Sequence, residues 1–251
     1  MRLGGFRLIG KSITYLIMHR ILWITIVIGV VIGFLFQFTG ATVPEHSALA
    51  YGYGAVKTIV SALWFIWVAV FVMQSLKHER MGLVQSLKKA CVNLALAWWY
   101  IVWLIFSRML LTFSLNMPKS YGETLPIILV FICWCLLALQ FLCDFFLIPL
   151  IADGLTSFRT AMGKTLVYLK SNFFTILAAL CAWCIVSLIV LMVFGFCAIL
   201  LQMALEKIFA VAAVSAVMKI LLIQFAAWTT LSLLVIAQSI FYLHLPNQPT
   251  K

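Results

Sequence analysis

Charged residues are scarce in this sequence. Of its 251 residues only 9% are Asp, Glu, Lys or Arg and 66% are hydrophobic, whereas an average soluble domain carries about 25% charged residues. A soluble core of this size does not need so much apolar surface. The composition therefore predicts a polytopic membrane protein.

Acidic residues are the rarer kind of charge: six Asp and Glu stand against 17 Lys and Arg, for a net charge of +11. Such an excess would suggest a nucleic-acid partner if the cations shared a water-soluble face. Here they flank the apolar runs, a position that favours anionic lipid headgroups as the partner. We therefore expect membrane lipids, and no nucleic acid, to be bound.

Cysteines in loops and closely spaced histidines are lacking. All seven cysteines lie in apolar runs, which excludes the disulfide framework of a secreted domain. The four histidines show no zinc-type spacing, so we expect no metal, no cofactor and no catalytic residue. Cys181 and Cys184 form a CxxC pattern, but a thiol in hydrocarbon resists forming the reactive thiolate. A membrane thiol redox protein is the least favoured function.

Long apolar runs are what the sequence has in abundance. A bilayer crossing needs roughly 20 residues, and the runs predict an all-α protein with six transmembrane helices. The predicted spans are 21–40, 57–76, 91–113, 125–150, 173–202 and 219–242. Residues 208–218 are expected to form an outer-surface or re-entrant helix, and the tail 244–251 is expected to fray.

Three basic amphipathic segments precede the odd-numbered spans, at residues 1–20, 77–93 and 149–174. In the third, Leu155, Phe158 and Met162 begin an apolar stripe of helical period, and Asp153 stands where an N-cap belongs. Such helices are typical of a membrane surface. The candidate lipid contacts are Arg7, Lys11, Lys88, Lys89, Arg159, Lys164 and Lys170.

An internal repeat links these segments. Residues 10–16, GKSITYL, match residues 163–169, GKTLVYL. Half the distance between them leads to residues 86–90, SLKKA, which resemble residues 157–161, SFRTA. This predicts one membrane domain over 1–251, built from a unit of about 76 residues used three times. The units are 1–76, 77–149 and 150–243, followed by the tail 244–251.

The distribution of Lys and Arg predicts the orientation. Twelve of the 17 lie in the amino-terminal segment, in residues 77–89 and 150–172, and in the tail, and five lie on the other side. The positive-inside rule then places both termini and all three basic segments in the cytoplasm.

Asp144 is an acidic residue deep in an apolar run, where a carboxylate costs roughly 2.5–3.5 kcal/mol by insertion scales. We expect it to meet a surface-helix cation (Lys88, Lys89, Arg159 or Lys164) or to be protonated; Arg108 should lie at another depth. Gln74 and Gln238 also lie at the inner ends of even-numbered spans. Together with Asp144 they predict either an inward polar cavity, as in a small transporter or permease, or a structural hydrogen-bond cluster.

Two glycine motifs each have two interpretations. Gly5 to Ser12 reads GFRLIGKS, a literal phosphate-loop pattern, but that loop needs a preceding strand, so a basic surface helix is favoured. Gly29 and Gly33 form a GxxxG step, which predicts either a homodimer or, more commonly, close packing within one chain.

Residues 146–174 carry a family resemblance. The stretch Phe146-Leu-Ile-Pro149, then Asp153-Gly154, Phe158, Ala161, Lys170 and Asn172-Phe173-Phe174 resembles the repeated element of a six-span bacterial inner-membrane family. That family includes the membrane domain of glycerophosphodiester phosphodiesterases. The resemblance implies a six-span fold in the bacterial inner membrane; the 251 residues hold no counterpart of the phosphodiesterase domain, so hydrolase activity is not implied.

The favoured function is thus that of a multi-pass, non-enzymatic protein of the cytoplasmic membrane. It would engage anionic lipid through its basic helices, with envelope homeostasis as the expected setting. The small transporter with a cavity at Asp144 is the alternative.

Overall fold

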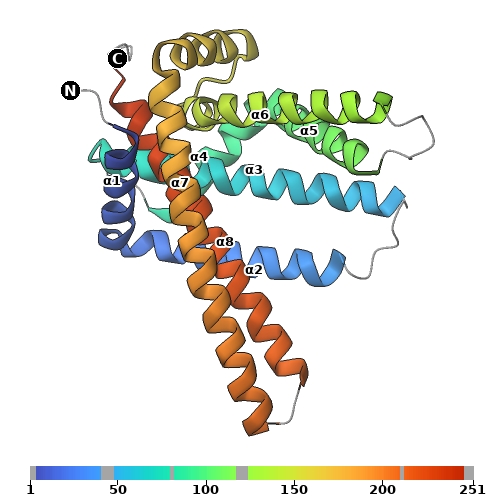
Figure 1. Ribbon diagram of the computed structural model, residues 1–251. Helices are drawn as coiled ribbons and strands as arrows, with labels where there is room; N and C mark the ends of the chain where they lie inside the picture. The colour runs from blue at the N-terminus through green and yellow to red at the C-terminus, as the bar shows by residue number, and fades with distance from the viewer. Residues whose placement is uncertain (1–3, 41–47, 80–81, 117–123, 210–211, 246–251) are drawn as a thin grey trace. The chain divides into compact units, whose positions relative to one another are not determined.

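The computed structural model describes residues 4–40, 48–79, 82–116, 124–209 and 212–245. The described chain contains helices and no strand (Figure 1). The helices are α1 (Gly5–Met18), α2 (Arg20–Gly40), α3 (Ala48–Leu76), α4 (Leu83–Leu96), α5 (Trp98–Asn116), α6 (Thr124–Ala152), α7 (Phe158–Phe209) and α8 (Ala212–Leu243).

Five of these helices are long and apolar enough to cross a membrane: α2, α3, α6, α7 and α8. The pair α4 and α5 adds a sixth if it is counted as one span, although the two are bent by 75°. The structure is therefore that of a multi-pass, all-α membrane protein, which confirms the predicted class. Side chains called exposed below are those not covered by protein; in a membrane such surface faces lipid or water.

The chain forms two compact units. Unit one comprises Met1–Tyr53 and Phe174–Lys251, and unit two comprises Gly54–Phe173. Helices α3 and α7 run through the boundaries at residues 53 and 173. The three predicted repeat units, which are a property of the sequence, do not coincide with these two units.

In unit one, α8 packs against α1 and α2. Helix α8 approaches α2 at Gly29, where an added Cβ would lie 2.8 Å from the Trp228 ring, and at Gly33, where it would meet Gln224 and Trp228. The GxxxG step therefore contacts α8 of the same chain, the alternative to a dimer. A homodimer through Gly29 and Gly33 stays a prediction.

Single-residue elbows connect α1 to α2 and α4 to α5. His19 and Ala97 leave helical geometry, with ψ of 87° and 37°. At each elbow the residue donates its N–H to the carbonyl four residues back, and its own carbonyl accepts an N–H three residues on. The predicted start of the third span, at Cys91, falls inside α4, which continues to Leu96 before α5 begins at Trp98.

Helix α6 ends in a Schellman motif. The Leu155 N–H donates to the Leu150 carbonyl (3.0 Å), the Gly154 N–H donates to the Ile151 carbonyl (2.9 Å), and Gly154 has φ of +95°, the left-handed geometry that glycine adopts at this position. The prediction of Asp153 as an N-cap is wrong, because Asp153 closes α6. Helix α7 begins only at Phe158, one turn later.

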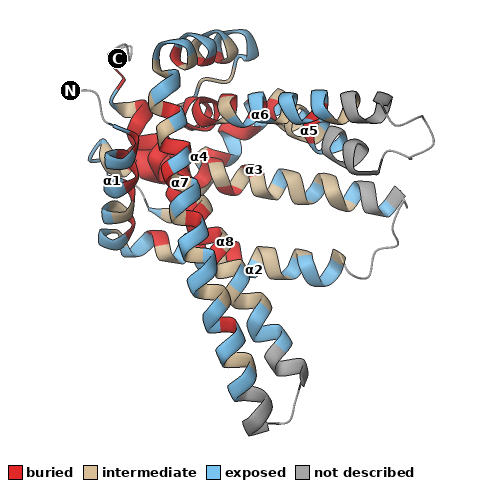
Figure 2. Cartoon of the chain, in the orientation of Figure 1, coloured by how far each residue is buried: buried red, intermediate tan, exposed pale blue. Residues whose placement is uncertain are grey.

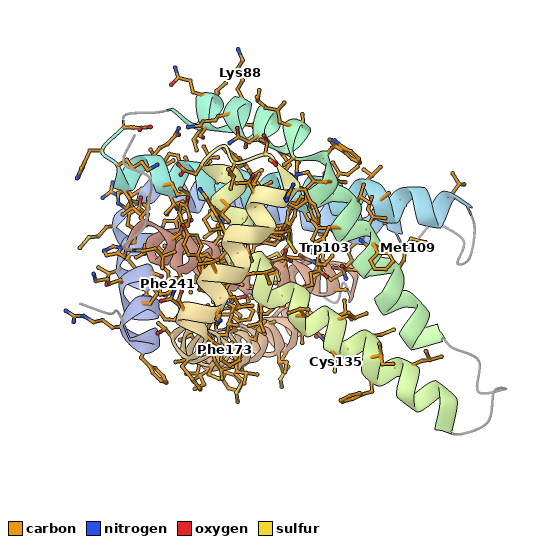
Figure 3. All side chains as sticks on the ribbon, turned by 90° about the horizontal axis from the view of Figure 1, so that it is seen from above. Lys88, Trp103, Met109, Cys135, Phe173 and Phe241 are labelled. Carbon is orange, nitrogen blue, oxygen red and sulfur yellow. The ribbon has the colours of Figure 1, made fainter. Side chains whose placement is uncertain are left out.

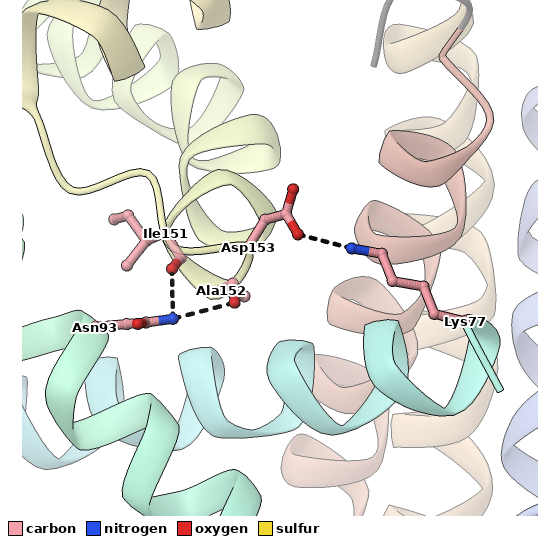
Figure 4. Close-up of polar contacts among 5 residues, drawn as sticks. All are labelled: Lys77, Asn93, Ile151, Ala152 and Asp153. Carbon is pink, nitrogen blue, oxygen red and sulfur yellow. Dashed lines mark hydrogen bonds and ion pairs between the residues drawn. The ribbon is translucent and has the colours of Figure 1, made fainter. Parts of the chain in front are cut away.

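Two side chains, one from α4 and one from the turn after α3, contact this end of α6 (Figure 4). Asn93 of α4 donates its side-chain amide to the carbonyls of Ile151 (2.9 Å) and Ala152 (3.1 Å), and Lys77 forms an ion pair with Asp153 at 2.7 Å. Carbonyls at a helix end lack helical partners, so Asn93 supplies a donor to the Ala152 carbonyl and a second donor to the Ile151 carbonyl, which already accepts the Gly154 N–H.

Helices α7 and α8 are more continuous than expected. Residues 158–209 form one helix through the predicted junction at residue 172, and α8 runs unbroken from Ala212 to Leu243. The predicted break at Lys219, with a separate helix over 208–218, is wrong for the described residues 212–218. Lys219 is exposed, and one exposed lysine interrupts no backbone hydrogen bond.

The buried side chains concentrate at one end of the spans (Figure 2). In unit two every residue of 66–73 and 145–152 is buried, whereas most of 131–142 in α6 is exposed. In unit one the continuously buried stretch is 232–242 of α8. In unit two the core therefore lies at the ends of α3 and α6 that lead into the next basic segment.

Candidate functional site

The candidate lipid-contact residues lie on the surface of their helices. Arg7 and Lys11 of α1, Lys88 of α4, and Arg159 and Lys170 of α7 are exposed. Lys89 and Lys164 are partly covered. Figure 3 shows Lys88 pointing away from the body of unit two. Within the described part of the chain, none of the seven forms an ion pair.

Each basic helix buries the face opposite its cations. The buried positions of α1 are Gly5, Leu8, Ile9, Ser12 and Leu16, and those of α4 are Ser86, Ala90, Asn93 and Leu94. In the first turns of α7 they are Ala161, Thr165 and Tyr168.

The phosphate-loop pattern takes no loop conformation. Residues 5–12 lie within α1, and the Ser12 hydroxyl donates to the Leu8 carbonyl at 2.9 Å. Gly5 lies so close to the backbone of Ala178 and Ala179 in α7 that an added Cβ would collide with it. The glycine serves helix packing in unit one, as the favoured interpretation expects.

Large apolar side chains are exposed beside the cations. Phe6 of α1 is 68% exposed, and Ile17, Met18, Val84 and Phe158 are also exposed. Each basic helix thus presents an exposed apolar surface next to its exposed cations, in addition to its buried face. This three-way division is characteristic of helices lying in the interfacial layer of a membrane.

Asp144 lies on α6 and hydrogen-bonds to the Tyr100 hydroxyl of α5. Its other oxygen, Oδ1, is buried and has no hydrogen-bond partner among the described residues. The expected partner, one of the surface-helix cations, forms no ion pair with it there. The prediction of a cationic partner is therefore wrong for the described residues: the group that meets Asp144 is an uncharged hydroxyl.

The Tyr100 hydroxyl was not among the partners expected for Asp144. The signal was a hydroxyl in the apolar run close to the elbow, at a depth comparable with Asp144. Arg108, further along α5, donates to the Gly54 carbonyl (3.1 Å) and to the Thr58 hydroxyl (3.2 Å).

The other two cavity candidates are also buried. Gln74 of α3 is 4% exposed, and neither its Nε2 nor its Oε1 has a hydrogen-bond partner among the described residues. Gln238 of α8 is buried with an unpartnered Oε1. Since Gln238 belongs to unit one and Gln74 and Asp144 belong to unit two, a cavity shared by all three stays a prediction.

Most of the buried polar atoms that lack a hydrogen-bond partner among the described residues lie in unit two. Besides Gln74 and Asp144, the indole Nε1 of Trp103 and the Thr165 hydroxyl have none among the described residues. An unsatisfied buried polar group costs about 1–3 kcal/mol, and each such group calls for an explanation.

The cysteines divide by exposure. Cys133 and Cys143 of α6 are buried, whereas Cys135, Cys181 and Cys184 are exposed, and all are free thiols. Where the chain is described, no three His, Cys, Asp or Glu side chains gather closely enough to hold a metal ion.

Comparison of the chain with protein-family models, with curated proteins and with solved structures gave no match. The resemblance of residues 146–174 to the six-span inner-membrane family stays an expectation.

Proposed function

We propose that this protein is a multi-pass protein of the bacterial cytoplasmic membrane that binds anionic lipid headgroups through its basic helices. Helices α1, α4 and the first turns of α7 would lie at the cytoplasmic surface, with both termini on that side. The proposal treats the protein as non-enzymatic and places it in the family suggested by residues 146–174, with envelope homeostasis as its setting.

One observation carries the proposal. On each basic helix, cations that form no ion pair within the described chain stand beside exposed apolar side chains, opposite a face buried against protein. A cation close to an anionic leaflet contributes on the order of 1 kcal/mol. The apolar side chains would enter the acyl region while the cations reach the phosphates.

The repeat is the second part of the proposal. Ser12, Ala90 and Thr165, spaced by 78 and 75 residues, are each buried at 0% exposure. The same spacing relates His19, Ala97 and Asn172, which all donate to the carbonyl four residues back. His19 and Ala97 use the backbone N–H (3.1 and 2.9 Å) and Asn172 uses its side-chain Nδ2 (3.1 Å).

These equivalent positions support three copies of one design: a surface helix, an elbow and a span. Asn172 would then mark the third elbow, although α7 remains helical there. Side chains that bond the carbonyl of residue i−4 often bend helices, which is the expected role of Ser171 and Asn172.

Lipid retention tests the proposal. The double variant Arg7→Gln with Lys11→Gln should reduce retention of phosphatidylglycerol and cardiolipin roughly tenfold or more, because two surface cations are lost. Native mass spectrometry of protein released from mixed lipid vesicles measures the retention, which should also fall as salt rises.

Lys219→Gln is the matched control, because it removes an exposed cation from α8, outside the basic helices. The proposal fails if the parent protein retains phosphatidylcholine as readily as acidic lipid. It also fails if the control variant loses as much acidic lipid as the double variant.

A further inference from the structure

The interface between α5 and α6 contains the acidic side chain found within the described candidate spans, Asp144. Figure 1 shows α5 and α6 running in opposite directions, and two contacts with α6, one on each side of the elbow at Ala97, agree with this. Asn93, before the elbow, bonds the carbonyls of Ile151 and Ala152, and Tyr100, after it, bonds Asp144. As residue numbers rise on α5 they fall on α6, so the two helices are antiparallel.

This register places Trp103 about one helical turn from the level of Asp144 along the two helices. Trp103 follows Tyr100 by about one helical turn on α5, and the corresponding turn of α6 carries Gln140, which is buried. Helix α5 contacts α6. Trp103 Nε1 and Asp144 Oδ1 are both buried and both lack partners among the described residues; one is a hydrogen-bond donor and the other is an acceptor.

The two residues as a whole are only partly covered, since Asp144 and Trp103 are of intermediate exposure. Part of each side chain therefore lies at the surface of the α5–α6 pair, while Oδ1 and Nε1 themselves are buried. Tyr100, in contrast, is 1% exposed and holds the second oxygen of Asp144 in place.

The chemistry of the group that would complete this interface follows from the three side chains. A carboxylate oxygen in an apolar setting favours a donor that carries positive charge. The faces of Tyr and Trp rings attract ammonium groups. The free indole N–H needs an acceptor, which an oxygen beside the ammonium group would supply.

We propose that Tyr100, Trp103 and Asp144 bind the ammonium group of a small organic amine that carries an oxygen acceptor next to it. Asp144 Oδ1 accepts from the ammonium, Trp103 Nε1 donates to the neighbouring oxygen, and the Tyr100 hydroxyl orients the carboxylate. The site is independent of the lipid proposal, which concerns anionic groups and other residues. A free amino alcohol and the headgroup of phosphatidylethanolamine share this chemistry.

Two arms of one experiment distinguish these sources. Titration calorimetry in nonionic detergent measures binding of 2-amino-1-phenylethanol, with 1-phenylethane-1,2-diol as the uncharged control. Native mass spectrometry compares retained phosphatidylethanolamine with phosphatidylcholine, which lacks N–H donors. Saturable binding in the first arm identifies a free amine, and selective retention in the second identifies the lipid.

Three variants test whether the amine binding or the lipid retention takes place at this site. Asp144→Asn keeps an acceptor for Tyr100 and should weaken binding at least tenfold. Trp103→Phe keeps a ring without the N–H and should weaken binding about two- to fivefold, because one neutral hydrogen bond is lost. Cys135→Ser, an exposed position on the same helix, should bind as the parent does.

The proposal is overturned if neither arm gives a signal, if the diol binds as tightly as the amine, or if Asp144→Asn binds like the parent. Should Asp144→Asn fail to fold, Trp103→Phe decides: unchanged binding there overturns the site.

Discussion

Two helix pairs, α2–α8 in unit one and α5–α6 in unit two, both place polar side chains on apolar helices. In the α2–α8 pair the amides of Gln37 and Gln224 bond each other at 3.0 Å. The same pair is packed closely at Gly29, against the Trp228 ring. Gln224 thus donates to Gln37, and the glycine at position 29 leaves room for a large side chain.

In the α5–α6 pair the polar groups are only half satisfied. Tyr100 bonds one oxygen of Asp144, while the other oxygen and the Trp103 N–H have no partner among the described residues. The difference teaches that polar residues in apolar helices serve two purposes. Those paired within the chain hold helices together, whereas buried polar atoms without a hydrogen-bond partner lower stability; at the α5–α6 pair they are the atoms that we propose bind an amine.

The largest change in the free energy of unfolding is expected from a substitution at Gly29, which packs against α8. Gly29→Leu should lower the free energy of unfolding by about 1–3 kcal/mol or more, because the added side chain must displace the buried Trp228 ring. Unfolding titrations in mixed micelles measure the change. Gly195→Leu is the control, since nothing lies within 4 Å of a Cβ there; an equal loss in both variants would mean that α8 does not pack on Gly29.

A smaller effect is expected at the paired amides. Gln224→Leu removes the hydrogen bond between Gln224 and Gln37 of α2, which should lower the free energy of unfolding by about 0.5–1.5 kcal/mol. The double variant with Gln37→Leu should recover most of the loss, because neither amide then needs a partner. A double variant less stable than the single one would contradict the pairing.

The smallest change in the free energy of unfolding is expected in the α5–α6 pair, at Asp144. Asp144→Asn preserves an acceptor for Tyr100 and removes a charge from an apolar helix, so the free energy of unfolding should stay the same or rise by about 1 kcal/mol or less. The same unfolding titration measures it. A fall in the free energy of unfolding by more than that amount would show that Asp144 is a structural group. The two helix pairs would then not differ in the way proposed here.

The spans could be predicted from sequence because a long apolar run specifies a crossing without tertiary information. The elbow at Ala97 could not be predicted. Apolar residues continue on both sides of it, and alanine is the best helix former. What accompanies the break is a tertiary contact, the Asn93 side chain on the carbonyls that end α6.

The error at Asp153 has a local cause. Asp is a preferred first residue of a helix, and Gly154 directly after it is a preferred last one. The sequence carried both signals one residue apart, and the glycine outweighed the aspartate. At the candidate site the acid was recognised from its surroundings, but its Tyr100 partner lies on another helix, and no periodicity within one helix reports such a pairing.

The elbow at Ala97 also fixes how α5 is rotated about its own axis relative to α4. Each residue inserted or removed there would turn the following helix by about 100° about its axis. The Asn93 amide meets α6 on one side of the elbow, and the Tyr100 hydroxyl meets it on the other. Both can face α6 together only with this spacing, so the stretch from Asn93 to Tyr100 tolerates changes of composition far better than changes of length.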